Sequence, residues 1–276
     1  MSDRLVVACL QTNATADIET NLKTIEPMIH EARKRGAQFI ALPENSNIMV
    51  RCREKLYERV KGISEEDATQ FFARMAKETG TWILAGSLAV HVGHEKLANR
   101  SYMFSPEGKI IAHYDKIHMF DADISEKESY RESNSYRKGD RAVLADTPWG
   151  KIGMTICYDV RFPHLHRTLA KAGANIITVP AAFAASTGKL HWHILLRARA
   201  IETGCFIIAP AQCGEHDGGR LTFGHSLIIA PSGEIIAEGH ADKPDIVIAE
   251  LDMNKVKEAR RMLPSLKHDC EFVQPC

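Results

Sequence analysis

Residues 142–159 read AVLADTPWGKIGMTICYD, two apolar segments on either side of Pro-Trp-Gly, which is the pattern of a β-hairpin. A helical pattern, LHRTLAKAG (165–173), and an apolar strand, ANIITVPAAF (174–183), follow it along the chain. A hairpin that continues into a helix and a strand implies a mixed sheet covered by helices, because purely parallel sheets contain no hairpins. This stretch therefore predicts a layered α/β architecture.

The same alternation of strands and helices continues to both ends of the chain. Apolar strands are predicted at 5–12, 38–44, 82–90, 205–212 and 245–252. Helices are predicted at 18–36, 64–79 (N-cap Ser64, stop at Gly80), 191–204 and 252–263. Two further hairpins turn at Pro-x-Gly: SYMFSPEGKIIAHYD (101–115) and HSLIIAPSGEIIAEG (225–239). We interpret residues 1–276 as a single α/β domain of two packed sheets with helices outside, ending in a tail over about 264–276.

Composition and charge exclude several classes of protein. Hydrophobic residues make up 45% of the 276 residues, which is ordinary for a globular chain. The 35 basic residues balance 35 acidic ones, so we expect neither nucleic acid nor a membrane as a partner. The N-terminal MSDRLVVACLQT has no signal-peptide layout, and the seven cysteines include no CxxC pair. These features favour a cytoplasmic protein with reduced thiols.

Three of the predicted strands end in a residue that can take part in chemistry. Glu44 ends FIALPE, Lys116 ends IIAHYDK and Cys157 ends IGMTIC. Reactive groups of α/β proteins collect at the carboxyl ends of strands. A carboxylate, an ammonium and a thiol can supply a general base, an electrostatic stabiliser and a nucleophile.

Each of the three residues also has an ordinary structural interpretation. Glu44 is placed where it can cap a turn, Lys116 can be a solvated loop lysine, and Cys157 can be one more packed thiol. Spacing along the sequence does not show that the three side chains converge.

Four histidines flank the same segments and favour a competing Cys–His arrangement: His113, His118, His164 and His166. If the strand continues past residue 116, His118 lies on the same face as Lys116, and periodicity does not choose between them. The pairs His164/His166 and His191/His193 lie two residues apart and point to different faces of a helix. We therefore expect no metal site from them, and GEHDGGR (214–220) is interpreted as a turn rather than a phosphate loop.

Three segments of the chain carry a family resemblance. In chain order they are FIALPEN (39–45), YDKIHMFD (114–121) and GMTICYDVRFP (153–163). They resemble the signature segments of the nitrilase superfamily of carbon–nitrogen hydrolases. The likeness covers essentially the whole chain and includes TGKLHWHILLRARAIETG (187–204) and FGHSLIIAPSGEIIAEG (223–239). The resemblance implies a four-layer α-β-β-α sandwich with two mixed sheets, paired through helices into a homodimer. It implies no metal and no organic cofactor.

The resemblance also assigns roles to the three strand-end residues. It implies that Glu44 is the general base, Lys116 the transition-state stabiliser and Cys157 the nucleophile that forms a thioester with an amide substrate. The Tyr158 N–H is expected to help hold the oxyanion.

A second glutamate, expected between the lysine and the cysteine, maps best to Glu132, although Glu126 and Glu128 lie nearby. Its implied role is to orient Lys116 or the substrate.

Within the superfamily, LLRARAIET (195–203) followed by AQCGEH (211–216) is most similar to the group of deaminated-glutathione amidases and ω-amidases, and to the former more than the latter. This likeness implies a small-molecule amide substrate with a terminal amide. The residues proposed for its pocket are Tyr158, Arg161, Phe183 and Thr187, and Arg161 has the alternative of a structural ion pair with Asp159. His193 departs from the pattern, because relatives usually carry glutamate after the tryptophan of HW.

Alternative functions remain open at the level of the sequence. They are an ω-amidase acting on α-ketoglutaramate, an N-carbamoyl-amino-acid amidohydrolase, and, in a different class, an inactive interaction protein on the same fold. The presence of Glu44, Lys116 and Cys157 favours an enzyme.

Overall fold

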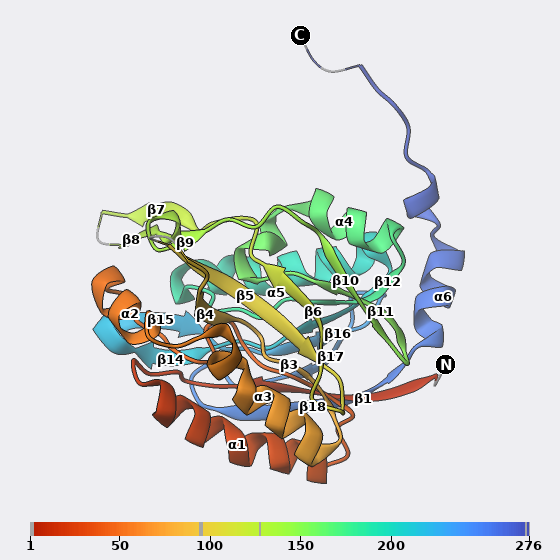
Figure 1. Ribbon diagram of the computed structural model, residues 1–276. Coiled ribbons are helices and arrows are strands. Elements are labelled where there is room, and N and C mark those ends of the chain that lie inside the picture. Colours follow the sequence, from red (N-terminus) through yellow and green to blue (C-terminus); the bar gives the residue numbers. More distant parts are fainter. Residues whose placement is uncertain (1–2, 94–95, 127, 274, 276) are drawn as a thin grey trace.

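The computed structural model describes residues 3–93, 96–126, 128–273 and 275. Two mixed sheets lie face to face in the middle, and helices cover the outer face of each, so the predicted α-β-β-α sandwich is confirmed (Figure 1). Among the described helices, none combines the length and the apolar character needed to cross a bilayer.

The first sheet contains the N-terminal strands and the last strand of the chain. Its order is β18 (Asp245–Asp252), β1 (Arg4–Gln11), β2 (Phe39–Ala41), β3 (Trp82–Leu84), β5 (Leu97–Phe104) and β4 (Leu88–His91), with β6 (Ile110–Asp115) and β9 (Tyr136–Arg137) also paired to β5. Helices α1 (Ile18–Lys34) and α3 (Glu65–Thr79) cover its outer face. Ser64 caps α3 in a capping box with Asp67, and Gly80 ends it in the left-handed conformation, as predicted.

The second sheet is built from the hairpin 142–159 and the segments that follow it. Its order is β10 (Val143–Thr147), β11 (Gly150–Met154), β12 (Ala174–Thr178), β13 (Phe206–Ala209), β16 (Leu227–Ile229) and β17 (Ile235–Glu238). The pairs β11–β12 and β12–β13 are parallel and the remaining pairs antiparallel. Helices α4 (Pro163–Lys171) and α5 (Ala185–Thr203) contact this sheet and each other.

Strand β1 shows how the layers are held together. Leu5, Val7 and Cys9 belong to the core that is shared with the second sheet, whereas Ala8 and Leu10 pack beneath α1 and α3. Successive side chains of a strand point to opposite faces. A strand buried on both faces therefore has the nearly continuous apolar sequence seen at 5–10.

The structure corrects several predicted boundaries. Helix α5 begins at Ala185 rather than 191. Its N-cap, Ala184, has no side chain that can cap the helix, so the sequence gives no signal for this start. The strand predicted at 82–90 divides into β3 and β4 around residue 86, and the one predicted at 174–183 ends at Thr178, just before Pro180. The last helix is α6 (Asn254–Met262).

Several polar elements have no counterpart in the prediction. They are α2 (Arg53–Val60), the ribbon of β7 (Asp121–Ser125) with β8 (Glu128–Arg131), the ribbon of β14 (Cys213–His216) with β15 (Arg220–Phe223), and four short 3₁₀ turns: η1 (Glu132–Asn134), η2 (Cys157–Arg161), η3 (Asp217–Gly219) and η4 (Ser265–Lys267). They are short, and β7 and β8 bury none of their residues, so hydrophobic periodicity does not reveal them. GEHDGGR is thus part of a hairpin, with its turn at 217–219.

After α6 the chain first runs along α4, where Arg167 donates to the Ser265 carbonyl (2.8 Å) and Lys171 pairs with Asp269 (2.6 Å). Beyond these contacts the described part of the tail extends away from both sheets (Figure 1). The cysteines that the structure describes are unpaired, and Cys270 of the tail is exposed. Cys276 lies outside the described residues.

The loop after β2 rests directly on the backbone around Gly86, which predicts a large effect of Gly86→Ala. Gly86 has φ +69°, and an added Cβ would lie 1.9 Å from the Pro43 carbonyl oxygen. Left-handed backbone costs a residue with a Cβ about 1–2 kcal/mol, and the collision adds to it, so we expect a loss of more than about 2 kcal/mol of unfolding free energy. Urea denaturation measures this loss.

The matched control is Gly80→Ala, since Gly80 has φ +62° and open space around it. It should lose only the conformational cost of about 1–2 kcal/mol. Equal losses for both variants would show that the contact with the residue 43 carbonyl contributes nothing.

Candidate active site

Glu44 lies in the loop that follows β2, and this loop is fastened to the connection between β3 and β4. Leu42 N–H donates to the Leu84 carbonyl (2.9 Å), and Ser87 N–H donates to the Pro43 carbonyl (3.1 Å). The next residue, Asn45, has φ +58°, which is uncommon for a residue other than glycine. This backbone turns the Glu44 side chain into the interior, where it is only 3% exposed.

Lys116 follows the last residue of β6 and is almost completely buried. Its Nζ donates to Glu44 Oε1 (2.8 Å) and to both carboxylate oxygens of Glu132 (2.9 and 2.8 Å). The structural interpretation of Lys116 as a solvated loop lysine is therefore wrong. One cation lies between two carboxylates, an arrangement that satisfies all three of its donors.

Among the candidate glutamates, Glu132 in η1 contacts Lys116, whereas Glu128 does not. Glu132 Oε2 also accepts from the Phe120 N–H (2.6 Å), and the Asn99 amide donates to both Glu132 (3.0 Å) and Glu44 (2.9 Å). Glu128 instead accepts from the Tyr130 hydroxyl (2.9 Å). The structure thus joins Glu44, Lys116 and Glu132 through Asn99, a residue that the sequence analysis missed.

Cys157 lies where β11 has ended and η2 begins. Its N–H donates to the Pro180 carbonyl (2.9 Å), and its φ is +46°, so the backbone at the thiol is in the left-handed region. Strained backbone of this kind is concentrated at functional sites. The thiol hydrogen-bonds the Glu44 carboxylate, and Glu44 Oε2 also accepts from the Ala182 N–H (2.8 Å).

The charges around this cluster set its protonation. Burial raises the pKa of Glu44, but the charge of Lys116 and hydrogen bonds from Lys116 and Cys157 outweigh it, so the pKa lies below its usual value. Burial lowers the pKa of Lys116, but the charges of Glu132 and Glu44 hold it well above the usual range. Burial and the charge of Glu44 raise the pKa of Cys157 well above that of a free thiol. At neutral pH the cluster therefore holds an ionised glutamate beside a protonated thiol.

The histidines do not form the alternative Cys–His pair. Strand β6 ends at Asp115, and the His118 imidazole is held by Asp159 Oδ1 (2.7 Å) while it stacks on Phe162. Burial lowers the pKa of His166 to about 4, so it is a neutral core residue that contacts the Phe162 carbonyl (3.3 Å).

A cavity of about 420 Å³ opens over the cluster. Glu44, Lys116, Glu132 and Cys157 all contribute to its wall, so the four residues predicted as catalytic share one cavity. Other residues of the wall were not predicted: Met49, Arg51, Phe120, Tyr130, Arg131, Tyr136 and Arg220. A volume of this size is in the range of small-molecule sites.

Arg220, at the start of β15, is the most informative of the residues that were missed. Its Nη2 donates to the Ala182 carbonyl (2.7 Å), and its guanidinium lies over the Tyr130 ring. Its Nε is buried without a hydrogen-bond partner, and among the described residues no carboxylate forms an ion pair with it. A cation with an unused donor at the wall of a cavity is suited to bind an anionic ligand.

The four residues predicted for the substrate pocket lie together on the other side of Cys157. Tyr158, Arg161, Phe183 and Thr187 line a small hollow that also touches Cys157 and Phe120. The Arg161 guanidinium lies over the rings of Tyr158 and Phe183.

The alternative of an Arg161–Asp159 ion pair is wrong. Asp159 is fully buried and accepts from the Tyr114 hydroxyl (2.7 Å), the Ile156 N–H (2.8 Å) and the His118 N–H (3.1 Å). Asp159 therefore fixes the turn that carries Cys157, while Arg161 stays at the edge of the hollow.

Comparison with known proteins places this geometry in a family. The carbon–nitrogen hydrolase family matches residues 6–261 of the chain. A protein of Synechocystis sp. named deaminated glutathione amidase is 39% identical over 267 residues, covering 95% of this chain and 97% of that protein.

Solved structures agree with this result. Nit3 of Saccharomyces cerevisiae, described as a member of branch 10 of the nitrilase superfamily, is 27% identical with a TM-score of 0.87 and 97% coverage of each chain. The NitFhit protein of C. elegans is 31% identical with a TM-score of 0.88; the match covers 96% of this chain and spans 65% of that longer chain.

The contact between Glu44 and Cys157 predicts that Glu44→Gln makes the thiol easier to ionise. The negative charge and the hydrogen bond of Glu44 both raise the pKa of Cys157, so removing the charge lowers that pKa. At a fixed pH near neutrality the alkylation rate of Cys157 by iodoacetamide should rise at least about tenfold. Mass spectrometry of the Cys157 peptide measures it separately from the exposed Cys52 and Cys270.

His118→Asn is the matched control, because His118 is bound to Asp159 rather than to the thiol. It should leave the pH dependence of Cys157 alkylation unchanged. A shift in His118→Asn with none in Glu44→Gln would instead restore the Cys–His pairing.

Proposed function

The chain belongs to the carbon–nitrogen hydrolase family, and on this premise we propose that it is a Cys-dependent amidase that hydrolyses deaminated glutathione through a thioester. The observation that carries the proposal is the single buried cluster in which the Glu44 carboxylate contacts both the Cys157 thiol and the Lys116 ammonium. A base, a nucleophile and a cation converge there at the wall of one cavity.

In the first step Cys157 Sγ attacks the amide carbonyl carbon as Glu44 takes the thiol proton. The resting protonation suits this order, because the thiol is protonated and the carboxylate ionised until substrate arrives. Proton transfer in the resting site is uphill, since it would neutralise the carboxylate and leave a buried thiolate. Attack on the carbonyl instead moves the negative charge from sulfur to the substrate oxygen.

Lys116 and the Tyr158 N–H are proposed to hold that oxyanion. A preorganised donor in a dry site typically contributes about 2.7–4 kcal/mol to transition-state stabilisation. Glu132 acts as a positioning residue, since both of its oxygens bind Lys116 Nζ and fix the ammonium in place.

The tetrahedral intermediate collapses when the amide nitrogen leaves with the proton that Glu44 received from the thiol. A water molecule then attacks the thioester carbon while Glu44 takes one of its protons. The C–S bond breaks, the thiolate recovers a proton, and the carboxylic acid is released. The proposed cycle uses the four residues of the cluster, the Tyr158 N–H and water.

Arg220 supports a substrate that carries a carboxylate. Deaminated glutathione is an amide between a keto-dicarboxylic acyl group and cysteinylglycine, so it has an anionic group on each side of the scissile bond. We propose that the Arg220 guanidinium, at the wall of the cavity, binds the carboxylate of the acyl group, and that the hollow lined by Tyr158, Arg161, Phe183 and Thr187 contacts the other side. α-Ketoglutaramate shares the acyl group but loses ammonia, and it is the second substrate to test.

The assay that tests the function follows keto acid release from deaminated glutathione and from α-ketoglutaramate. We expect a higher kcat/KM for deaminated glutathione and no turnover by Cys157→Ala. If wild type equals Cys157→Ala across both substrates and a panel of N-carbamoyl amino acids, the chain is an inactive interaction protein on this fold. Preference for a carbamoyl substrate would assign it to the other amidohydrolase group.

Arg220→Gln should lower kcat/KM for both keto-acid amides by about 10- to 100-fold, since a hydrogen bond to a charged group is worth about 1.5–3 kcal/mol. A neutral aliphatic amide without a carboxylate should be affected far less. Arg131→Gln is the control, because Arg131 lines the same cavity but is already paired with Asp123. Equal losses in both variants would contradict the proposed role of Arg220.

We also propose a homodimer in the cytoplasm. Three large apolar side chains of α5 are exposed on one helical face: Leu190 (64%), Ile194 (70%) and Ile201 (52%). The resemblance to helix-paired relatives favours a second copy of the chain as their partner. Light scattering at micromolar concentration should give twice the mass of the chain, and Ile194→Asp should give a monomer. A monomeric wild type would rule out this pairing.

A further inference from the structure

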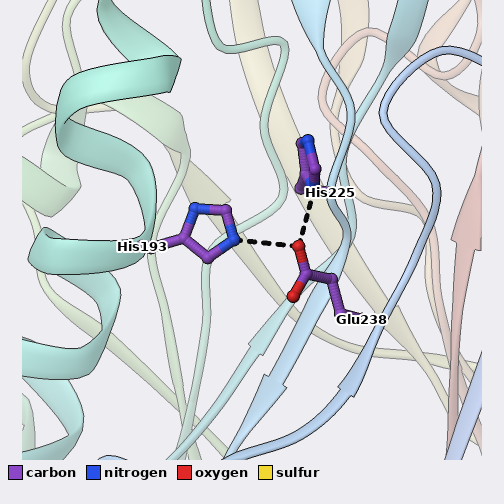
Figure 2. A group of neighbouring side chains, drawn as sticks. All are labelled: His193, His225 and Glu238. Carbon is purple, nitrogen blue, oxygen red and sulfur yellow. Dashed lines mark hydrogen bonds and ion pairs between the residues drawn. The ribbon is translucent and has the colours of Figure 1, made fainter.

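A second cluster of chemically active side chains lies between α5 and the edge of the second sheet. It consists of His193 on α5, His225 just before β16 and Glu238 at the end of β17. His193 Nε2 and His225 Nδ1 both contact Glu238 Oε1, at 2.9 and 2.6 Å. Figure 2 shows the two imidazole rings approaching one carboxylate, one from the helix and one from the strand side.

We propose that this cluster, the His193–His225–Glu238 site, binds a divalent transition metal of the Zn²⁺ class. Two imidazole nitrogens and a carboxylate oxygen within 4.8 Å of one another are a donor set that such ions prefer. At bond lengths of about 2.0–2.1 Å, ligand atoms of a tetrahedral ion lie roughly 3.3 Å apart. The present contacts of 2.9 and 2.6 Å need to open by about 0.4 and 0.7 Å to admit the ion.

The backbone at His225 is held in a conformation that histidine rarely adopts. Its φ is +51°, its N–H donates to the His240 carbonyl (3.0 Å), and its own carbonyl accepts from Trp192 Nε1 (2.8 Å). Among the described residues other than glycine, only Asn45, Cys157 and His225 have positive φ. The first two line the cavity of the candidate active site, and strained backbone persists where function requires it.

The surroundings favour an ion with room for a further ligand. The three side chains are 31%, 24% and 36% exposed, so water can complete the coordination. Phe223 packs against both imidazole rings, with ring centres 5.9 Å from His193 and 4.4 Å from His225, and restricts their orientation. The only ion-pair partners of Glu238 in the described part of the chain are these two histidines.

One other cluster of described residues brings similar donors together, and its chemistry is different. Glu26, His30 and Glu78 also lie within 4.8 Å of one another. There the Arg74 guanidinium pairs with both carboxylates, at 3.3 Å each, so a cation is already in place. This cluster supplies a matched negative control.

The test is a titration of the full-length protein with Zn²⁺ by calorimetry and with Co²⁺ by absorption. We expect one ion per chain and no thiolate-to-metal band. His193→Ala, His225→Asn and Glu238→Gln should each weaken binding at least about tenfold, since even outer-shell partners of a metal typically contribute about 10–100-fold. Asn is chosen at 225 because it tolerates positive φ.

His30→Ala and His240→Ala should bind as wild type does. Each variant is first melted without metal, and Zn²⁺ should raise the melting temperature of wild type but not of the three site variants. Wild-type affinity in His193→Ala and Glu238→Gln, or a Co²⁺ spectrum with thiolate bands that disappear in Cys157→Ala, would overturn the proposal.

Discussion

The candidate active site depends on one buried cation, Lys116, between the carboxylates of Glu44 and Glu132. Removing a partner from such a group typically costs about 3–5 kcal/mol, because it leaves an unpaired charge in the interior. The three residues come from a loop after β2, the end of β6 and the turn η1, so the charges are paired only when these segments are correctly placed. A fourth residue, Asn99 on β5, donates a hydrogen bond to each of the two carboxylates.

The same pairing sets the protonation of Cys157, the proposed nucleophile. Glu44 is ionised because Lys116 stabilises its charge, and this charge in turn disfavours a thiolate at Cys157. In the proposed mechanism the thiol therefore stays protonated until a carbonyl can accept the negative charge. A preformed thiolate needs a cation whose effect on the sulfur prevails. Here Lys116 is bound to Glu44, the proposed base, and its charge lowers the pKa of Cys157 less than burial and the charge of Glu44 raise it.

The sequence predicts the layers, the two mixed sheets and the residues at strand ends, because these follow from apolar periodicity and turn chemistry. Hairpins at Pro-x-Gly and the caps of α3 are local signals, and the structure confirms them. Arg220 and Asn99 were not predicted for a physical reason. Neither stands after an apolar run that would mark it, and each reaches the site through tertiary contacts between distant segments. Likewise, the spacing of histidines along the sequence does not indicate a site whose members lie up to 45 residues apart, as His193, His225 and Glu238 do.

Helix α5 links the hollow beside Cys157 to the His193–His225–Glu238 site through side chains that contact both. The Trp192 ring packs against Phe183, 5.0 Å between ring centres, and Phe183 lines the hollow beside Cys157. The indole N–H of the same residue holds the His225 carbonyl, and His193 follows it directly in the helix. Trp192 is completely buried, so its position fixes both neighbours at once. The helix runs unbroken from Thr187, beside the hollow, to His193 in the second site.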